Sequence, residues 1–404
     1  MVWLINKISY LFIVRLNQKK LRQNDKKYLI KFAAFDRKVE KDMQKIAIKF
    51  PRQSGNDFYN TVRQRVHEYF QKGEISKYAN TEMVMKTIFM LSLYFIPYLF
   101  VLFLGGVSTW LYLLLWVIMG TGMAGIGLSI MHDANHGAYS QNRKVNDFIS
   151  KVIWFVGGSY TNWRIQHNVL HHSFTNINEH DEDLETVPFL RFSPHKKRMK
   201  IHRLQYIYAW FFYGLMTLMW ATTKDFKQLI RYKNNNLLKS EKRPYKSLMR
   251  ELIVVKAIYY ILFLVLPLIL SNQSWWVVVL GFVVMHFVAG FILASIFQPA
   301  HVMPETDFPE PKEDGSMENQ WAEHQLRTTV NFAPKSKLFS WYVGGLNFQI
   351  EHHLFPNICH VHYKKISGIV QKTAKEFNLP YYSKRTFFAA LWAHKNFLKQ
   401  LGKA

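Results

Sequence analysis

The sequence predicts an all-α integral membrane protein with four transmembrane helices arranged as two hairpins, and three observations support this fold class. Four apolar segments each have about the 20 residues that a helix needs to cross a bilayer. They occur as two pairs with very short linkers. None of the 52 lysine and arginine residues lies between positions 87 and 142 or between positions 257 and 311, which contain the two pairs.

The first pair consists of the apolar segments 87–107 and 109–131, and the second pair consists of 252–270 and 275–297. Only Ser271, Asn272, Gln273 and Ser274 separate the helices of the second pair. Segments 147–160 and 205–222 are also apolar, but we expect them to be interfacial or re-entrant. A fifth span would place the histidine clusters described below on opposite sides of the membrane.

The distribution of basic residues predicts the topology. Residues 1–86, 143–256 and 312–404 are rich in lysine and arginine, so the positive-inside rule places both termini in the cytoplasm. Residues 1–85 are then predicted to form cytoplasmic amphipathic N-terminal helices. Residues 86–404 form the membrane domain, with catalytic cytoplasmic segments at 132–251 and 298–404. Lys7 and Arg15 interrupt the first apolar stretch, which argues against a signal peptide.

The net charge of +25 does not by itself indicate a nucleic-acid-binding protein. Basic chains often bind phosphate backbones, but the sequence has no nucleic-acid-binding motif, and the positive-inside distribution accounts for the charge. The single cysteine, Cys359, cannot form an intramolecular disulfide.

Seven of the 17 histidines fall into three short motifs beside the apolar segments: HDANH, HNVLHH and QIEHH. Residues four apart share a helix face, so His132 and His136 can meet at one site, and His167 and His171 repeat that spacing. Adjacent helical residues diverge by about 100°, so the doublets suit two neighbouring metal ions. The set lacks the carboxylates of soluble di-iron bundles, which favours an imidazole-rich iron centre held by a cytoplasmic helical cap.

The three motifs, in this order and spacing, resemble the histidine boxes of the membrane fatty acid desaturases, and the resemblance covers roughly residues 80–365. It implies a di-iron centre with His132, His136, His167, His171, His172, His352 and His353 as iron ligands. It also implies an eighth ligand, His301, although a histidine at the end of a span can be a simple polar anchor. Asn347 would act through water, and Gln349 would bind weakly or hydrogen-bond to a ligand.

Four other positions near the boxes have two interpretations each. Asp133 and Asp183 could accept hydrogen bonds from ligand imidazoles or be ordinary surface charges. Trp163 could shape an acyl channel or anchor the protein at the membrane interface. His286 lies within a predicted span, and we expect a packed histidine satisfied by a neighbouring helix rather than a residue that contacts substrate.

The resemblance implies oxygen-dependent introduction of a cis double bond into a fatty acyl chain. Gln349 at the start of the third box is typical of the front-end subgroup, which acts between an existing double bond and the carboxyl end. The acyl chain could be carried by coenzyme A, an acyl carrier protein or a glycerolipid. The sequence has no HPGG haem motif, so we expect an external electron donor such as ferredoxin or cytochrome b5.

Two other functions remain open from the sequence. A related membrane di-iron hydroxylase or ketolase would use similar boxes, although QIEHH argues against it. A membrane metal transporter would need polar or charged residues inside its spans, and only Lys256, near an end, and His286 occur there.

Overall fold

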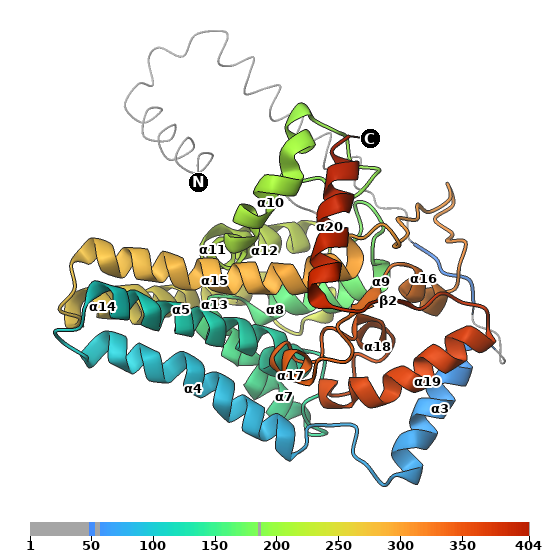
Figure 1. Cartoon of the computed structure of the whole chain (residues 1–404), viewed down its shortest axis with the longest axis horizontal. Helices are drawn as coiled ribbons and strands as arrows, with labels where there is room; N and C mark the ends of the chain where they lie inside the picture. The colour runs from blue at the N-terminus through green and yellow to red at the C-terminus, as the bar shows by residue number, and fades with distance from the viewer. Residues whose placement is uncertain (1–47, 53–56, 185–186, 404) are drawn as a thin grey trace. The chain divides into compact units, whose positions relative to one another are not determined.

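The computed structural model describes residues 48–52, 57–184 and 187–403, and it is predominantly helical (Figure 1). Residues 1–47 lie outside the described residues, and so does most of the predicted N-terminal helical region 1–85. The chain divides into two compact units, residues 1–49 with 312–316 and residues 50–311 with 317–404. In the first unit Lys49 forms a single parallel bridge with Ser316. The elements described below belong to the second unit.

Four helices of the described chain are long and apolar enough to cross a membrane, in agreement with the prediction. They are α4 (Thr81–Phe103), the continuous rod Thr109–Asn135, the rod Tyr245–Leu270, and α15 (Trp275–His301). Each begins or ends a few residues away from the predicted span. Side-chain caps begin two of them, because Asn80 accepts from the amide of Met83 and Ser108 accepts from that of Leu111.

Two of these rods contain a π-helical turn. The first consists of α5 (Thr109–Gly125), η1 (Ile126–Ile130) and α6 (Met131–Asn135). The second consists of α13 (Tyr245–Tyr260), η7 (Ile261–Val265) and α14 (Leu266–Leu270). Both η1 and η7 are π-helices, which insert a residue into the α-helical repeat and often occur at functional sites.

Helix α5 lies between α4 and α15, and small residues allow the close approach. A Cβ on Gly122 would lie 2.7 Å from the backbone nitrogen of Tyr94 in α4. A Cβ on Gly120 would lie 2.6 Å from the carbonyl oxygen of Met285 in α15. The apolar stretch of the Thr109–Asn135 rod is therefore 72% buried inside the protein. The corresponding stretch is 39% buried in α4 and 33% buried in the Tyr245–Leu270 rod.

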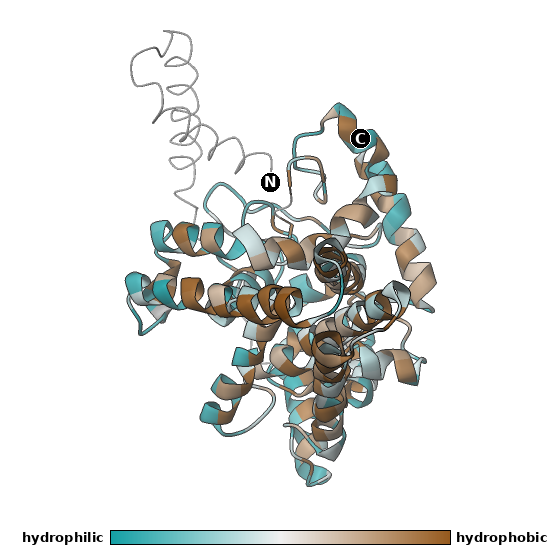
Figure 2. Cartoon of the chain, turned by 90° about the vertical axis from the view of Figure 1, so that its left-hand side faces the viewer, coloured by the Kyte–Doolittle hydropathy of each residue, from teal (hydrophilic) through white to brown (hydrophobic). Residues whose placement is uncertain are grey.

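The less buried rods present large apolar side chains outward. Ile88 and Leu99 of α4 are half exposed, as are Ile258 and Ile261 of the Tyr245–Leu270 rod. Figure 2 shows hydrophobic colour over long stretches of the helices, on those that point toward the viewer and on one seen lengthwise at the left. An apolar surface of this extent requires an apolar environment, which a lipid bilayer provides.

The two ambiguous apolar segments form short helices. Segment 147–160 lies in α7 (Arg143–Ser150) and η2 (Lys151–Val156), and α8 (Tyr160–Trp163) begins at its last residue. Segment 205–222 forms α10 (Gln205–Gly214), α11 (Met216–Met219) and the start of η5 (Trp220–Lys224), a π-helix. Helices α10 and α11 pack on α15, where a Cβ on Gly290 would lie 2.6 Å from the carbonyl oxygen of Gly214. Their depth in the membrane stays a prediction.

The remaining elements surround the histidine motifs. After η3 (Arg164–His171) and α9 (His172–Phe174) come η4 (Lys200–Leu204), α12 (Asp225–Asn234) and η6 (Leu237–Ser240). After α15 the chain forms α16 (Trp321–Arg327), β1 (Val330–Phe332), α17 (Lys337–Tyr342), α18 (Gln349–Leu354), η8 (His360–His362), α19 (Tyr363–Glu376), β2 (Tyr382–Lys384) and α20 (Phe387–Leu401). Strands β1 and β2 pair in parallel, a small departure from the predicted all-α fold.

Helix α3 (Phe58–Lys72) covers the elements around the third histidine motif (Figure 1). Its buried residues Phe58, Val62, Val66 and Phe70 follow the spacing of one helix face. They belong to the same apolar cluster as Phe355 and residues of α19. This part of the predicted N-terminal region therefore packs on the segments that carry the site.

Candidate metal centre

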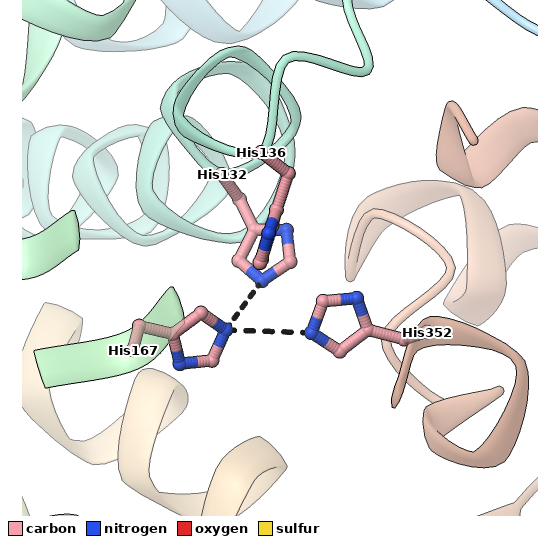
Figure 3. Close-up of side chains that lie close together, drawn as sticks. All are labelled: His132, His136, His167 and His352. Atoms are coloured by element: carbon pink, nitrogen blue, oxygen red, sulfur yellow. Dashed lines mark hydrogen bonds between the residues drawn. The ribbon is translucent and has the colours of Figure 1, made fainter. Parts of the chain in front are cut away.

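Four histidines from three separate parts of the chain meet at one point (Figure 3). One ring nitrogen from each of His132, His136, His167 and His352 lies within 4.8 Å of the others. The Nε2 atom of His167 is 3.3 Å from Nε2 of both His132 and His352. Gly137 has a positive φ of 71°, which allows the chain to leave the helix immediately after His136.

A second group lies beside the first and is formed by His171, His301 and His353, whose ring nitrogens also lie within 4.8 Å of one another. His172 lies between the two groups, because it forms a further triplet with His352 and His353. Its Nε2 atom is 3.0 Å from Nε2 of His352. The adjacent pair His352 and His353 thus contributes one ring to each group, as expected for neighbouring residues on a helix.

The second histidine motif departs from the predicted α-helical spacing. Residues Arg164–His171 form the π-helix η3, in which residues five apart approach the same face. The Nε2 atoms of His167 and His172 are consequently 3.3 Å apart, and His171 turns to the second group. His167 and His171, which we expected to meet at one site, also lie with Asp183 in a further group whose ligand atoms are within 4.8 Å of one another. Propensity and periodicity gave no sign of the π-helix.

Several of the eight histidines have properties that metal ligands share. Nε2 of His136, His301 and His353 is buried without a hydrogen-bond partner among the described residues. Imidazole nitrogens bound at about 2.1 Å to one metal ion lie about 3.0 to 3.4 Å apart, close to the separations found here. Burial, together with the neighbouring imidazoles, lowers the pKa of His172, His352 and His353, and neutral imidazole is the form that binds metals.

Four of these histidines use their Nδ1 atom to contact an oxygen that fixes the ring. The partners are Asp181 for His171 at 3.0 Å, the carbonyl of Thr328 for His301 at 3.1 Å, Gln325 for His353 at 2.8 Å, and the Tyr363 hydroxyl for His352 at 3.2 Å. Such contacts leave Nε2 directed at the centre. Gln325, Thr328 and Tyr363 were missed from the sequence, because they lie in no histidine motif.

Asp133 and Asp183 only partly match their predicted contacts. Asp133 is 3.8 Å from Nδ1 of His132, too far for a hydrogen bond, and bonds His360 at 2.8 Å instead. His360 also contacts the buried ammonium group of Lys86 at 2.7 Å. A carboxylate oxygen of Asp183 lies 3.5 Å from Nδ1 of His171. The carboxylate of Asp181 is closer to the same atom, at 3.0 Å. Burial opposes protonation of His171, but Asp181 and Asp183 raise its pKa to about 9.

Asn347 and Gln349 are both buried next to the third motif. The side-chain amide of Asn347 donates to the carbonyl oxygens of Phe332 and Ala333, and its own Oδ1 has no partner among the described residues. Gln349 begins α18, and its Nε2 likewise lacks a described partner. The water-mediated role of Asn347 and the weak metal binding or hydrogen bond of Gln349 stay predictions.

Trp163 contacts histidines of the first group and is 6% exposed, so it is buried rather than placed at an exposed surface. Its ring centroid lies 4.5 Å from that of His167 and 5.4 Å from that of His132. It also lines a cavity of about 190 Å³ that reaches His167. The cavity walls are mainly apolar, from Leu190, Phe192, Phe212, Tyr213, Met216, Met219, Trp220, Ala294 and Phe297, and polar residues including Asp183 and Lys224 complete them.

Two polar residues inside the spans, His286 and Lys256, contact other protein groups. His286 contacts the Tyr259 hydroxyl at 2.9 Å and the Thr217 hydroxyl at 3.1 Å, so it is the packed histidine that the sequence predicts. Lys256 forms a buried ion pair with Asp225 at 2.6 Å. These contacts give both residues a packing role within the helix bundle.

Comparison with known proteins identifies the family. The fatty acid desaturase family model matches residues 108–385. The chain is 35% identical over 362 residues to an acyl-lipid (8-3)-desaturase of Physcomitrium patens, covering 89% of this chain and 74% of the relative. It is 34% identical over 344 residues to an sn-1 linoleoyl-lipid 6-desaturase of Arthrospira platensis, covering 85% and 92%. A relative with the same description in Synechocystis is 34% identical over 361 residues, covering 88% and 98%.

The family model covers more than half of the chain, and all three histidine motifs lie within the matched residues. The four long apolar helices agree with a membrane-embedded member of this family. The chain therefore belongs to the fatty acid desaturase family, and it is an integral membrane oxidoreductase that desaturates fatty acyl chains.

Proposed function

We propose that the eight histidines hold two iron ions, one in each group, with His172 beside both. His132, His136, His167 and His352 would bind the first ion, and His171, His301 and His353 the second. The observation that carries this proposal is the convergence of buried ring nitrogens, several of which have no hydrogen-bond partner in the part of the chain that the structure describes. Iron would supply the oxidising chemistry that an unactivated C–H bond requires and that no side chain here can provide.

The protein itself would position the acyl chain and exclude water. Ligand pockets usually have a volume of about 300 to 1,000 Å³, and the cavity beside His167 is smaller. It would therefore enclose only the part of the acyl chain that reacts. Trp163 and Phe297 line this cavity, and both rings contact histidines of the first group. They would hold two adjacent methylene carbons against the centre, and the cavity would thereby select the carbons that lose hydrogen.

The proposed substrate is an acyl chain esterified in a glycerolipid, with the new double bond on the carboxyl side of an existing one. The relatives support this proposal, since their names describe acyl-lipid (8-3)-desaturases and sn-1 linoleoyl-lipid 6-desaturases. Gln349 at the head of the third motif agrees with this front-end subgroup. The distribution of lysine and arginine supports a topology with both termini and the centre on the cytoplasmic side.

Expression in a host without polyunsaturated lipids tests this function. Cells would be supplied with defined fatty acids, and mass spectrometry would locate new double bonds in each glycerolipid class and in the acyl-CoA pool. We expect a new bond between an existing one and the carboxyl end, appearing first in glycerolipid. The His171→Ala variant serves as the inactive control. New hydroxyl or keto groups in place of double bonds would contradict the proposal.

A further inference from the structure

A basic groove lies between α3 and the segment that follows the third histidine motif. It has a volume of about 780 Å³, and its lining includes Tyr59, Arg63, His67, Lys77 and Phe355. The first three are spaced four residues apart along α3 and therefore share one face of that helix. The neighbouring face of α3 is buried in an apolar cluster, and its residues Val66 and Phe70 also line the groove, so the groove lies on a helix that is held in place.

The cations of this groove are available to a partner. No carboxylate lines the groove, and the described residues contain no acidic partner within ion-pair distance of Arg63 or Lys77. The neighbouring cations of α3 differ, because Arg65 pairs with Glu376 at 2.7 Å and Lys72 pairs with Glu68 at 3.1 Å. The positive charge of the groove is therefore not neutralised within the described protein and would attract an acidic surface.

Aromatic side chains connect the groove to the metal centre. The ring of Tyr59 stacks on Phe355 at 6.4 Å and meets the ring of Trp321 edge-on at 5.5 Å. The indole nitrogen of Trp321 donates a 3.1 Å hydrogen bond to the carbonyl oxygen of His172. Phe355 follows His353 by two residues in the sequence. Tyr59 is thus connected to the candidate ligand His172 through Trp321, and to the candidate ligand His353 through Phe355 and the chain.

We propose that this groove is the docking surface for an acidic one-electron carrier protein, which reduces the metal centre through Tyr59 and Trp321. This inference rests on the proposed function, because desaturation needs external electrons: R–CH₂–CH₂–R′ + O₂ + 2 e⁻ + 2 H⁺ → R–CH=CH–R′ + 2 H₂O. Two carbon–hydrogen bonds are oxidised, and dioxygen is reduced to two waters. The carrier docks twice in each turnover and is oxidised by one electron each time.

An anionic lipid surface is the competing partner for a basic groove. Lipid headgroups would require only the charges of Arg63 and Lys77. They would give no reason for an aromatic contact that continues to His172. The combination of unpaired cations with aromatic rings in contact with the centre favours a protein partner whose electrons must reach that centre.

Charge reversal tests docking. The Arg63→Glu/Lys77→Glu variant and the control variant Lys242→Glu, altered at an exposed site elsewhere, would be purified with iron in uncharged nanodiscs. Soluble cytochrome b5 and plant-type ferredoxin, each kept reduced, would be titrated against product formation. For at least one carrier we expect the double variant to raise the KM about tenfold at low salt, with kcat unchanged. The dependence of that KM on salt should also weaken, and the control should match the unmodified protein.

A second variant tests the aromatic route. Tyr59→Leu should lower kcat at saturating carrier severalfold and leave KM unchanged, whereas the control Tyr69→Leu on the same helix should alter neither value. Reduced methyl viologen, a small molecule that needs no docking surface, should support equal product formation by all variants. Loss of product with methyl viologen in the unmodified protein would instead contradict the proposed function.

An unchanged carrier KM in the double variant, with both carriers active, would overturn the docking proposal. An effect that appears only in nanodiscs containing anionic phospholipid would also overturn it, since the groove would then bind headgroups. An unchanged kcat in Tyr59→Leu would overturn the route through that residue.

Discussion

Buried histidines in this protein fall into two sets that differ in their hydrogen bonds. In the two histidine groups, Nε2 of His136, His301 and His353 has no partner among the described residues. Elsewhere, both ring nitrogens of His286 contact hydroxyl groups, and both of His394 contact oxygen atoms, from the Tyr213 hydroxyl and the Val302 carbonyl. Burial is therefore not what separates the two sets.

This difference in hydrogen bonding separates histidines available to bind a metal ion from histidines that only pack. Leaving a buried polar atom unsatisfied costs about 1 to 3 kcal/mol, so a fold does not gather several such atoms without a group that completes them. The histidines of the second set already have complete hydrogen bonding and need no further ligand. The comparison predicts that only the first set controls metal content, and the following experiments test it.

Removal of the metal should have the largest effect. Chelation should abolish product formation, and it should also lower the thermal stability, because a metal that binds only the folded protein stabilises it. Adding Fe²⁺ should restore both properties. Product analysis, metal analysis and thermal unfolding check this. Full activity in protein shown to lack iron would contradict a metal centre.

The His301→Ala variant should lose at least about 100-fold of its activity and part of its iron, because it removes one of three rings in the second group. The matched control is His394→Ala, which alters a buried histidine of the other set and should keep its full iron content. Metal analysis of both purified variants distinguishes them. Equal iron loss in the two variants would mean that the hydrogen-bonding difference has no functional meaning.

The Asp181→Asn variant should weaken iron binding or activity by about 10- to 100-fold, the range usual for groups that orient metal ligands. Asp181 accepts from Nδ1 of His171 at 3.0 Å, and an amide would hold that ring less firmly. Asp147→Asn, at a half-exposed carboxylate that pairs with Arg164, is the control. Iron titration followed by product formation measures both. A normal iron affinity in Asp181→Asn would exclude this orienting role.

The smallest functional effect is expected from His286→Leu. This change leaves the Tyr259 hydroxyl without its partner, so we expect a stability loss of about 1 to 3 kcal/mol with normal iron content and kcat. Ile269→Ala, at an outward-facing position that is 69% exposed, should change stability less. Thermal unfolding in detergent checks both variants. Loss of iron in His286→Leu would place this histidine in the first set.

The sequence alone determined the family, the four apolar helices and the residues of the histidine clusters. Apolar length and the absence of lysine and arginine are local properties that a bilayer imposes on any helix that crosses it, so 275–297 and 109–131 could be found without a structure. Motif spacing also indicated two neighbouring sites, since adjacent histidines on a helix must diverge.

Only the tertiary structure decided which histidines meet and what orients them. The π-helix Arg164–His171 brings His172, five residues on, to within 3.3 Å of His167, which an α-helical spacing did not predict. Gln325, Thr328 and Tyr363 reach the ligands from segments far from the first two motifs. Asp133 bonds His360 and not His132, because folding brings a stronger partner to it. Such contacts join residues distant in sequence, and no local pattern records them.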